Sequence, residues 1–491
     1  MRAVQNESTR SDEGEVTETI SNWTVDLKWE SIPQHVRDRA KTLILDGVSC
    51  AIIASHLPWS EDAVRAVLTT ETPGGISPII GWKDLKTGLI GSALINSAFI
   101  QGFELDDYHA TAPLHNNSIL MPAVLSAAAS VGYEKVSGKD FILAMIAGYE
   151  VGPRVGNSLG GGNILSKGWH SGAVFGAPAA AAACSKIFEL DATQMEDAFG
   201  MACTQACGLT SARFESSVKR MQHGFAARNG LFAAMMAKAN YKGISQIFDR
   251  KLGGFVEVFS NGVEQGNRKE EIIKDLSKAW ETLNIHIKPY PCMGGIHSTV
   301  DCVLALQKSE AIPVGLKAAD IESVRIELTE PAFKHGGWKA TKPLNEIGAQ
   351  MNVTYICAVI IRDGVLTMKH FAKEKINEQS LWDIVDKTTC SIAEFPEYPI
   401  SADRANGLCA RVTIKLANGE EKVSTIPQPK GVRAATTHEE VAEKFRQLTQ
   451  GIITKEQQDN IQRVVEKLDK AETLNYLVDA MNLTARSPLD V

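Results

Sequence analysis

The chain has 491 residues, of which 44% are hydrophobic and 22% are charged, and its formal net charge is −7. This length exceeds one compact core, so we expect two domains in a globular protein of ordinary composition. The acidic balance, without a long basic run, argues against nucleic acid as a partner. No apolar run approaches the roughly 18 residues that span a bilayer, so no membrane partner is expected.

The N-terminal segment, residues 1–17, is polar and acidic. It lacks the apolar core of a secretory signal and the Arg-rich, acid-poor character of a transit peptide. We therefore predict a disordered tail on a cytoplasmic protein. The nine cysteines are scattered, which predicts buried, reduced thiols. Cys203 and Cys207 lie one helical turn apart, but without a second pair they make a poor zinc site.

Residues 18–268 are dominated by helix-length segments rich in Ala, Leu, Ile and Met, which predict a large all-helical domain. His170, in SKGWHSGAVFGAP, lies where one of these helices is expected to begin. Thr193 is followed by Glu196 at the spacing of a capping box, which predicts another helix start.

The sequence pattern changes near Gly266. Residues 320–327, DIESVRIE, alternate as in a half-buried strand, and Asn418-Gly419 joins two further alternating runs as a hairpin. An apolar helix is expected over residues 351–366. We predict a smaller α/β domain at residues 269–430, followed by helices at 431–491 that return to the helical domain. The fold class is thus mostly α, with an α+β part.

One short stretch concentrates titratable residues between two apolar segments. FELDDYHATAPLHNNS contains three carboxylates and two imidazoles, at Glu104, Asp106, Asp107, His109 and His115. A metal cage, an acid/base site and a solvated loop all fit this composition. No helical HxxxH or ExxH spacing supports a metal site, so acid/base chemistry or substrate binding is favoured.

Other candidates are polar residues within apolar segments. Lys219 and Arg220, with His223 close behind, form either a solvated helix face or an inward-facing group. His297 follows a Pro-Gly loop where the two domains are expected to meet, a common place for a cleft. Tyr355, in MNVTYICAVII, is either a core tyrosine or a site residue. No nucleotide-binding, HExxH or GxSxG motif accompanies them.

The motifs ELDDYHATAPLHNNSILMPAV, GWHSGAVFGAPA, VKRMQHGFAARNG and IKPYPCMGGIHS resemble the 2-methylcitrate dehydratase (MmgE/PrpD) superfamily, in particular its fungal decarboxylases. The resemblance runs from SNWTVDL to SPLDV. It implies a homodimer with a helical domain, an α/β lid and a site between them. It also implies that cis-aconitate is converted to itaconate and CO2 without a metal or organic cofactor. A hydro-lyase of the 2-methylcitrate dehydratase type and a non-catalytic tricarboxylate-binding protein remain alternatives.

The resemblance also assigns roles by position. The residues expected to be catalytic are His115, His170, Lys219 and Tyr355; those expected to bind substrate are Glu104, Tyr108, His109 and His297; those expected to support the histidines are Asp106 and Asp107. Animal and bacterial relatives carry an Asp and a Thr where this chain has Glu104 and Tyr108. We expect His115 to be the leading proton donor and His170 to bind carboxylate. Tyr355 and His297 would orient the substrate from the lid side.

Overall fold

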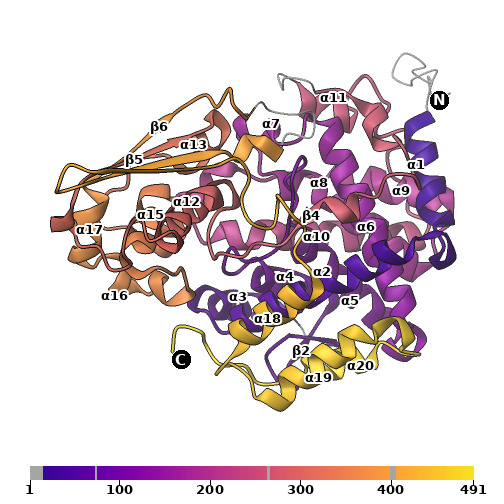
Figure 1. Ribbon diagram of the computed structural model, residues 1–491. Coiled ribbons are helices and arrows are strands. Elements are labelled where there is room, and N and C mark those ends of the chain that lie inside the picture. Colours follow the sequence, from indigo (N-terminus) through magenta and orange to yellow (C-terminus); the bar gives the residue numbers. More distant parts are fainter. Residues whose placement is uncertain (1–14, 72–73, 262–265, 399–404, 491) are drawn as a thin grey trace.

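The computed structural model describes residues 15–71, 74–261, 266–398 and 405–490. Within these ranges the chain forms a helical body and a smaller part built around a sheet (Figure 1). The mostly helical fold class is therefore confirmed. Most of the predicted tail lies outside the described residues, but α1 (Glu15–Asp26) begins within its last three residues. Thr17 is buried there, because its backbone N–H and hydroxyl donate to Asp249 at 2.9 and 2.7 Å.

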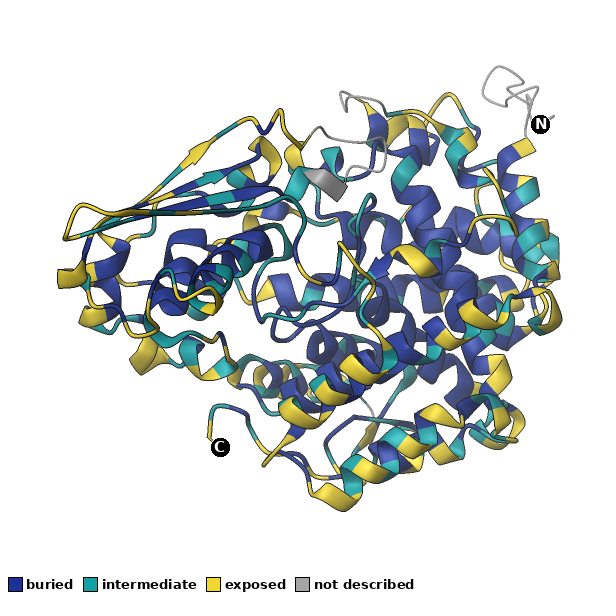
Figure 2. Ribbon diagram, in the orientation of Figure 1, coloured by how far each residue is buried: buried dark blue, intermediate teal, exposed yellow. Residues whose placement is uncertain are grey.

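Helix α8 (Ser171–Phe188) lies at the centre of the helical body. It packs against α5 (Asn116–Val131), α6 (Gly138–Ser158) and α10 (Val218–Lys238), and its Ala- and Gly-rich sequence is almost entirely buried (Figure 2). Gly230 of α10 has no room for a Cβ beside the backbone of Ala177. The small residues thus let these helices approach closely. Around them lie α2 (Gln34–Ala54), α3 (Pro58–Leu68), α4 (Leu89–Ile100), α7 (Asn163–Ser166), α9 (Ala192–Cys203) and α11 (Phe255–Ser260).

The predicted start of α9 at Thr193 is wrong. The helix begins at Ala192, and its N-cap is Asp191, two residues before Thr193. The side chain of Asp191 accepts from the backbone N–H of Gln194 at 2.8 Å, and the Gln194 side chain returns to the N-cap backbone. Glu196 instead accepts from the backbone N–H of Gln246. An Asp two residues upstream offers an equally good capping oxygen, which the Thr-to-Glu spacing alone does not reveal.

The smaller part contains a four-stranded sheet in the order β6-β5-β7-β8. The predicted strand at 320–327 corresponds to β5, and the predicted hairpin at Asn418-Gly419 is confirmed by the antiparallel pairing of β7 with β8. The sheet strands are β5 (Ile321–Leu328), β6 (Thr388–Ile392), β7 (Ala410–Leu416) and β8 (Glu421–Ile426). Its helices are α12 (His297–Lys308), α13 (Glu330–Gly336), α14 (Glu346–Met351), α15 (Val353–Asp363), α16 (Lys373–Ile376) and α17 (Gln379–Val385). Helix α12 packs on β7 and β8, and α15 contacts β6.

The C-terminal helices lie against the helical body (yellow in Figure 1), although they follow the sheet in sequence. They are α18 (His438–Thr449), α19 (Lys455–Glu466) and α20 (Asn475–Met481). Helix α18 packs on α2, where Lys444 donates to the buried carboxylate of Asp46 at 2.6 Å. The same ammonium donates to the backbone oxygen of Leu105 at 2.8 Å. The C-terminal segment therefore contacts the acidic stretch directly.

Two further observations concern membrane spans and thiols. Taken singly, no described helix has the length and apolar character to cross a membrane; α2 and α3 meet the requirement only as a pair bent by 87°. All nine cysteines are free thiols, and most are buried as predicted. The prediction is wrong for Cys207, which is exposed on the loop after α9.

A short antiparallel pairing joins the two parts of the molecule beside the acidic stretch. Strand β3 (Tyr108–His109) pairs with β4 (Ile285–His286). A second small sheet, β1 (Ser77–Pro78) with β2 (Lys86–Thr87), lies elsewhere in the body. The β3–β4 pairing brings residues 101–115 next to the segment that contains Lys288 and leads to His297.

Candidate functional site

Residues 101–115, which we call the acidic loop, connect the end of α4 to the start of α5. The loop is buried along most of its length, and His115 is the N-cap residue of α5. Glu104 has a φ of 55°, in the left-handed region that non-glycine residues rarely occupy. Such a backbone persists only where the surroundings fix it, and it is concentrated at functional sites. The contacts of the Glu104 side chain supply that constraint.

The carboxylate of Glu104 accepts from three buried cationic side chains, which we call the cation cluster: Lys219, Arg220 at 2.7 Å and Lys288 at 3.1 Å. Lys219 and Arg220 come from the first turn of α10, and Lys288 follows β4. Burial alone would raise the pKa of Glu104, but the charges of the cluster hold it well below its usual value. Even with Asp106, which lies 3.3 Å from Lys288, two buried carboxylates face three cations, which leaves the cluster net positive.

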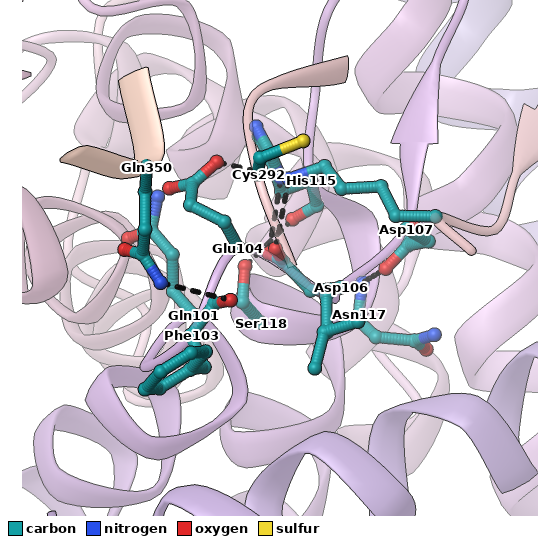
Figure 3. A network of polar contacts seen from close by, with 12 residues as sticks. Gln101, Phe103, Glu104, Asp106, Asp107, His115, Asn117, Ser118, Cys292 and Gln350 are labelled. Carbon is teal, nitrogen blue, oxygen red and sulfur yellow. Dashed lines mark hydrogen bonds and ion pairs between the residues drawn. The ribbon is translucent and has the colours of Figure 1, made fainter. Parts of the chain in front are cut away.

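The second part of the molecule also contacts the cluster. Gln350, at the end of α14, accepts from Arg220 and donates to the backbone oxygen of Phe103 at 3.4 Å (Figure 3). Arg220 donates as well to the backbone oxygen of Gln101 at 3.0 Å. The cation cluster therefore lies where the helical body meets the sheet-containing part.

Burial lowers the pKa of Lys219 to about 8, although the neighbouring carboxylate of Glu104 opposes this. Lys288 behaves differently, because Glu104 and Asp106 together outweigh burial and raise its pKa. Lys219 is consequently the member of the cluster whose charge is most easily lost as the pH rises.

Asp106 connects the cluster to His115. Its carboxylate lies 3.3 Å from Lys288 Nζ on one side and 3.0 Å from His115 Nδ1 on the other. At this distance the carboxylate and the His115 ring form a close ion-pair contact. Burial would raise the pKa of Asp106, but the charges of His115 and Lys288 lower it to about 2. Asp106 is therefore a fixed negative charge beside the His115 ring.

Asp107 turns away from the cluster (Figure 3). Its two oxygens accept the backbone N–H groups of Asn116 and Asn117, each at 2.9 Å. These are the first residues of α5, so Asp107 fixes the helix start directly after His115. Burial and the adjacent Asp106 raise its pKa to about 7, in spite of these bonds.

Three histidine rings pack against one another beside the cluster, in tilted and edge-on orientations. The His223 ring centroid lies 5.1 Å from that of His115 and 5.1 Å from that of His170. His223 contacts Ser118 through Nδ1 at 2.7 Å and Gln101 through Nε2 at 3.2 Å. It fits there because residue 172 is glycine, and any Cβ at that position would collide with the His223 ring.

His170 is the N-cap residue of α8, which confirms the prediction that it lies at a helix start. Burial and the positive charge of Lys219 lower its pKa to about 3. Burial also lowers the pKa of His223 well below its usual value. Both rings are therefore neutral near pH 7. The His115 side chain is 18% exposed, whereas His170 and His223 are 8% and 0% exposed as residues, so His115 is the accessible imidazole of the three.

Of the predicted site residues, the structure brings together Glu104, Asp106, His115, His170 and Lys219. Others lie in different surroundings. His109 accepts from the backbone of Ala112 and contacts Glu281 at 2.9 Å, away from the cluster. Tyr108 lies on β3 with its ring 5.8 Å from that of His286.

The two residues predicted on the lid side also differ in setting. His297 begins α12, and its Nε2 contacts the backbone oxygen of Cys292 at 3.0 Å. Burial lowers its pKa to about 3, and the charges of Lys288 and Glu104 also influence it, so it lies near the cluster. Tyr355 lies in α15 and donates to the backbone oxygen of His370 at 2.5 Å. The hydroxyl of Tyr355 is therefore already bonded within the sheet-containing part.

Sequence reasoning left several residues of the site without a role: Gln101, Ser118, Arg220, His223, Lys288 and Gln350. One signal was available, because Lys219 and His223 are four residues apart and share a helix face. Lys288 had a weaker signal, as a lone cation after alternating isoleucines in IHIKPYP.

Buried polar atoms without a hydrogen-bond partner gather around this site. Among the described residues they include Gln101 Oε1, Asp106 Oδ2, His115 Nδ1, His170 Nδ1, Arg213 Nε, Arg220 Nε, Gln222 Oε1 and His297 Nδ1. Buried polar atoms are normally satisfied in native proteins. The unpartnered donors among them, Arg213 Nε and Arg220 Nε, together with the net positive cluster, suit a polar, anionic ligand.

The structure also bears on a metal site. Within the described ranges, no three His, Cys, Asp or Glu side chains are grouped as metal ligands would be. The carboxylates of the acidic loop are instead occupied by lysine, arginine and backbone N–H groups. The lysine and arginine side chains gathered here suit an organic anion as ligand.

Some surface hollows of the described residues lie away from the site. One, of about 550 Å³, is lined by residues such as Val131, Lys186 and Lys238 at the C-terminal ends of α5, α8 and α10. No member of the cation cluster lines it. The chemistry of the site, and not its volume, identifies it.

A helical body, a smaller sheet-containing part and a buried cation cluster where they meet define a two-part helical protein with an anion site. Residues 18–266 match the MmgE/PrpD N-terminal domain and residues 290–470 match the MmgE/PrpD C-terminal domain. The chain therefore belongs to the MmgE/PrpD family, as the sequence motifs indicated.

Curated relatives match along nearly the whole chain. A cis-aconitate decarboxylase-like protein of Aspergillus oryzae is 40% identical over 476 residues, covering 95% of this chain and 97% of the relative. A cis-aconitate decarboxylase of Aspergillus terreus is 38% identical over 485 residues, with 96% and 97% covered. The human cis-aconitate decarboxylase is 22% identical over 471 residues, covering 94% and 93%.

Proposed function

We propose that this protein is a cis-aconitate decarboxylase, a carbon–carbon lyase that forms itaconate and CO2. A relative that is 38% identical over almost the full length is named cis-aconitate decarboxylase, and one that is 40% identical is named cis-aconitate decarboxylase-like protein. The observation that carries the proposal is the buried cluster of Lys219, Arg220 and Lys288 beside the accessible ring of His115. A tricarboxylate needs several fixed cations, and its decarboxylation needs one proton donor.

The reaction moves one electron pair along the carbon chain. When the carboxylate on the methylene arm leaves as CO2, its bonding electrons form the new terminal double bond. The old double bond shifts its electrons toward the carboxylate on the vinyl carbon and forms a dienolate. A proton delivered to the former vinyl carbon then gives itaconate. Atoms and charge balance with one proton taken up and no redox partner.

The cation cluster suits the stabilisation of that dienolate. Fixed positive charges in a site with little water stabilise developing negative charge far more than they do in bulk water. Lys219 and Lys288 are 5% and 1% exposed, so water has little access to their ammonium groups. Glu104 neutralises part of this charge in the free protein, and a bound tricarboxylate would share or replace it.

We assign the proton transfer to His115. Its Nδ1 lies against Asp106, a carboxylate that stabilises the cationic ring, so the proton transferred would be that on Nε2. His170 and His223 are held neutral by burial, which suits hydrogen bonding to substrate better than donation from an imidazolium. Asp107 positions His115 by fixing the start of α5.

The remaining candidate residues lie around the cluster and His115. His297 lies close enough to Lys288 and Glu104 to orient substrate beside the cluster. Glu104 pairs with the cations of the cluster, and it affects the substrate only by changing the charge that these cations present to it. Burial raises the pKa of Tyr108 and the charge of Lys288 opposes this, so Tyr108 would act beside the cluster. His109 and Tyr355, whose described contacts lie outside the cluster, would act by shaping the loop and the helix near the site.

We also propose a homodimer. Exposed apolar side chains lie along one face of α10 and on the segment before it: Leu209 is 60% exposed, Phe214 40%, Val218 42% and Phe232 44%. Several large apolar side chains exposed on neighbouring segments are consistent with an interface. Sedimentation of the purified protein tests this, and a monomer at micromolar concentration would contradict it.

The free thiols support a reducing, cytoplasmic setting, which we propose for this protein. A fluorescent fusion tests it: we expect diffuse cytoplasmic signal, and signal confined to an organelle would contradict it.

The activity is tested by incubating purified protein with cis-aconitate without added cofactor and identifying products by NMR. We expect itaconate and CO2, with the rate unchanged after prolonged EDTA treatment. Hydration products, or dehydration of 2-methylcitrate, would instead assign a hydro-lyase. Tight binding without any product would assign a tricarboxylate-binding protein.

A further inference from the structure

Arg213 is the last residue of a short 3-10 helix, η4 (Thr210–Arg213), and the chain that leads into this helix pairs with the His170 loop. Backbone bonds fix this placement. The His170 N–H donates to the Gly208 oxygen at 3.1 Å, and the Thr210 N–H donates to the Gly168 oxygen at 3.0 Å. Gln222 of α10 adds a bond to the backbone oxygen of Leu209 at 2.9 Å. The segment that contains Arg213 is therefore tied both to the His170 loop and to the helix of the cation cluster.

The guanidinium of Arg213 has neutral partners. It contacts the ring nitrogen Nδ1 of His335, lies 3.4 Å from the backbone oxygen of Lys334 and stacks 4.9 Å from the Phe214 ring. No carboxylate of the described residues pairs with it, and its buried Nε has no hydrogen-bond partner. Burial lowers the pKa of His335 to about 4, so that ring is a neutral acceptor.

A half-buried arginine without a counter-charge is costly, because buried charges are normally paired. Here the unpaired charge lies beside a site whose ligand is an anion. It is close enough to His170 to contribute to the lowered pKa of that ring, together with Lys219 and His115. Arginine also presents a planar fork that matches a carboxylate in a bidentate way, which lysine does not.

We propose that Arg213 binds one carboxylate of the tricarboxylate, on the His170 side of the site, and thereby distinguishes tricarboxylates from dicarboxylates. This inference rests on the proposed function for the identity of the ligand. Arg213 supplies a cation separate from the cluster, so the three carboxylates of one substrate are divided between two groups of positive charge. It binds substrate in the ground state as well as during reaction.

The test measures binding by calorimetry, without turnover. Tricarballylate is a saturated tricarboxylate; glutarate lacks its central carboxylate, and methylsuccinate lacks a terminal one. For the natural protein we expect tricarballylate to bind about tenfold or more tighter than at least one of these dicarboxylates. In Arg213→Gln, the affinity for tricarballylate should fall about tenfold. The affinity for the dicarboxylate that lacks the carboxylate bound by Arg213 should change by less than about threefold.

Two further variants make the result specific. Arg213→Lys keeps the charge and loses the fork, so it should recover only part of the preference. Arg37→Gln is the matched control: Arg37 stacks 4.9 Å from the Trp29 ring and also has a buried, unpartnered Nε, but it lies on α2 beside Asp469 and Lys470. Its binding of all three ligands should be unchanged.

The outcomes separate this inference from the proposed function. Equal loss of affinity for all three ligands, or no loss, in Arg213→Gln overturns the role of Arg213, whatever the turnover assay gives. Selective loss for tricarballylate supports it, even if NMR shows no itaconate and the proposed activity fails. If Arg213→Gln does not fold, the Arg213→Lys variant decides: an unchanged preference for tricarballylate overturns the inference.

Discussion

Replacing Glu104 with glutamine tests whether one carboxylate neutralises the cation cluster. The amide keeps the size of the side chain but removes the charge that Lys219, Arg220 and Lys288 share. Removing one partner of a buried ion pair typically costs about 3–5 kcal/mol. Lys288 keeps Asp106 at 3.3 Å, so we expect the lower end, a loss of about 3 kcal/mol in the free energy of unfolding at pH 7.

The pH dependence gives the prediction a sign. Because the pKa of Glu104 in the folded protein lies well below its usual value, its contribution to stability is present above the unfolded pKa. That contribution is lost as the pH falls through the folded pKa. The difference between natural protein and Glu104→Gln should therefore be largest near neutral pH and shrink in acid.

Urea unfolding followed by circular dichroism measures this difference. Adding tricarballylate should stabilise Glu104→Gln more than the natural protein, because the ligand then supplies the missing negative charge. As a control, Glu330→Gln removes an exposed pair with Lys334 and should change stability by only about 0–1 kcal/mol. If Glu104→Gln is as stable as the natural protein at pH 7, Glu104 does not neutralise the cluster and the reasoning is refuted.

Three other predictions concern Lys219, His115 and Lys444. Lys219→Met should lower kcat/KM about 100-fold or more, measured by itaconate formation. In the natural protein kcat/KM should fall as the pH rises through about 8, where Lys219 loses its charge, and Lys219→Arg should move that fall upward. His115→Gln should lower kcat by about 10²–10⁴-fold with little change in tricarballylate affinity. Lys444→Met should cost about 3–5 kcal/mol by leaving the buried Asp46 unpaired, and Asp46→Asn/Lys444→Met should regain much of it.

A specific result would refute each of these three predictions. Near-normal turnover by Lys219→Met would remove that lysine from the site. A raised KM with unchanged kcat in His115→Gln would reassign His115 to binding. The pKa of Asp46 is raised by burial even with Lys444 present, so Lys444→Met should lose further stability as the pH rises above the usual pKa of an aspartate. A pH-independent loss would show that the ion pair is not its cause.

Local features of the fold were predictable where neighbouring residues determine them. The hairpin at Asn418-Gly419 follows from a turn that needs positive φ, and Gly419 has a φ of 90°. His170 was placed at a helix start because apolar, small-residue sequence follows it. The start of α9 was misplaced because Asp191 and Thr193 are both good capping residues and only packing decides between them.

The site was predictable only in part, because its contacts are long-range. Glu104 is 115 residues from Lys219 and 184 from Lys288 in sequence. Lys288 approaches the acidic loop only because β3 pairs with β4, and strands of two residues leave almost no pattern in a sequence. His109 has the same residue type as His115 and lies in the same loop, yet its partner is Glu281. Side-chain direction within a loop does not follow from composition.

The most direct test of the central claim is turnover of cis-aconitate in D2O, followed by NMR. A cationic site that holds the dienolate while His115 delivers a solvent-exchanged proton predicts itaconate with one deuteron on the saturated methylene and none on the terminal alkene carbon. Lys219→Met and His115→Gln should give little of this product. Deuterium on the alkene carbon, itaconate without deuterium, or an undiminished yield from both variants would contradict the account.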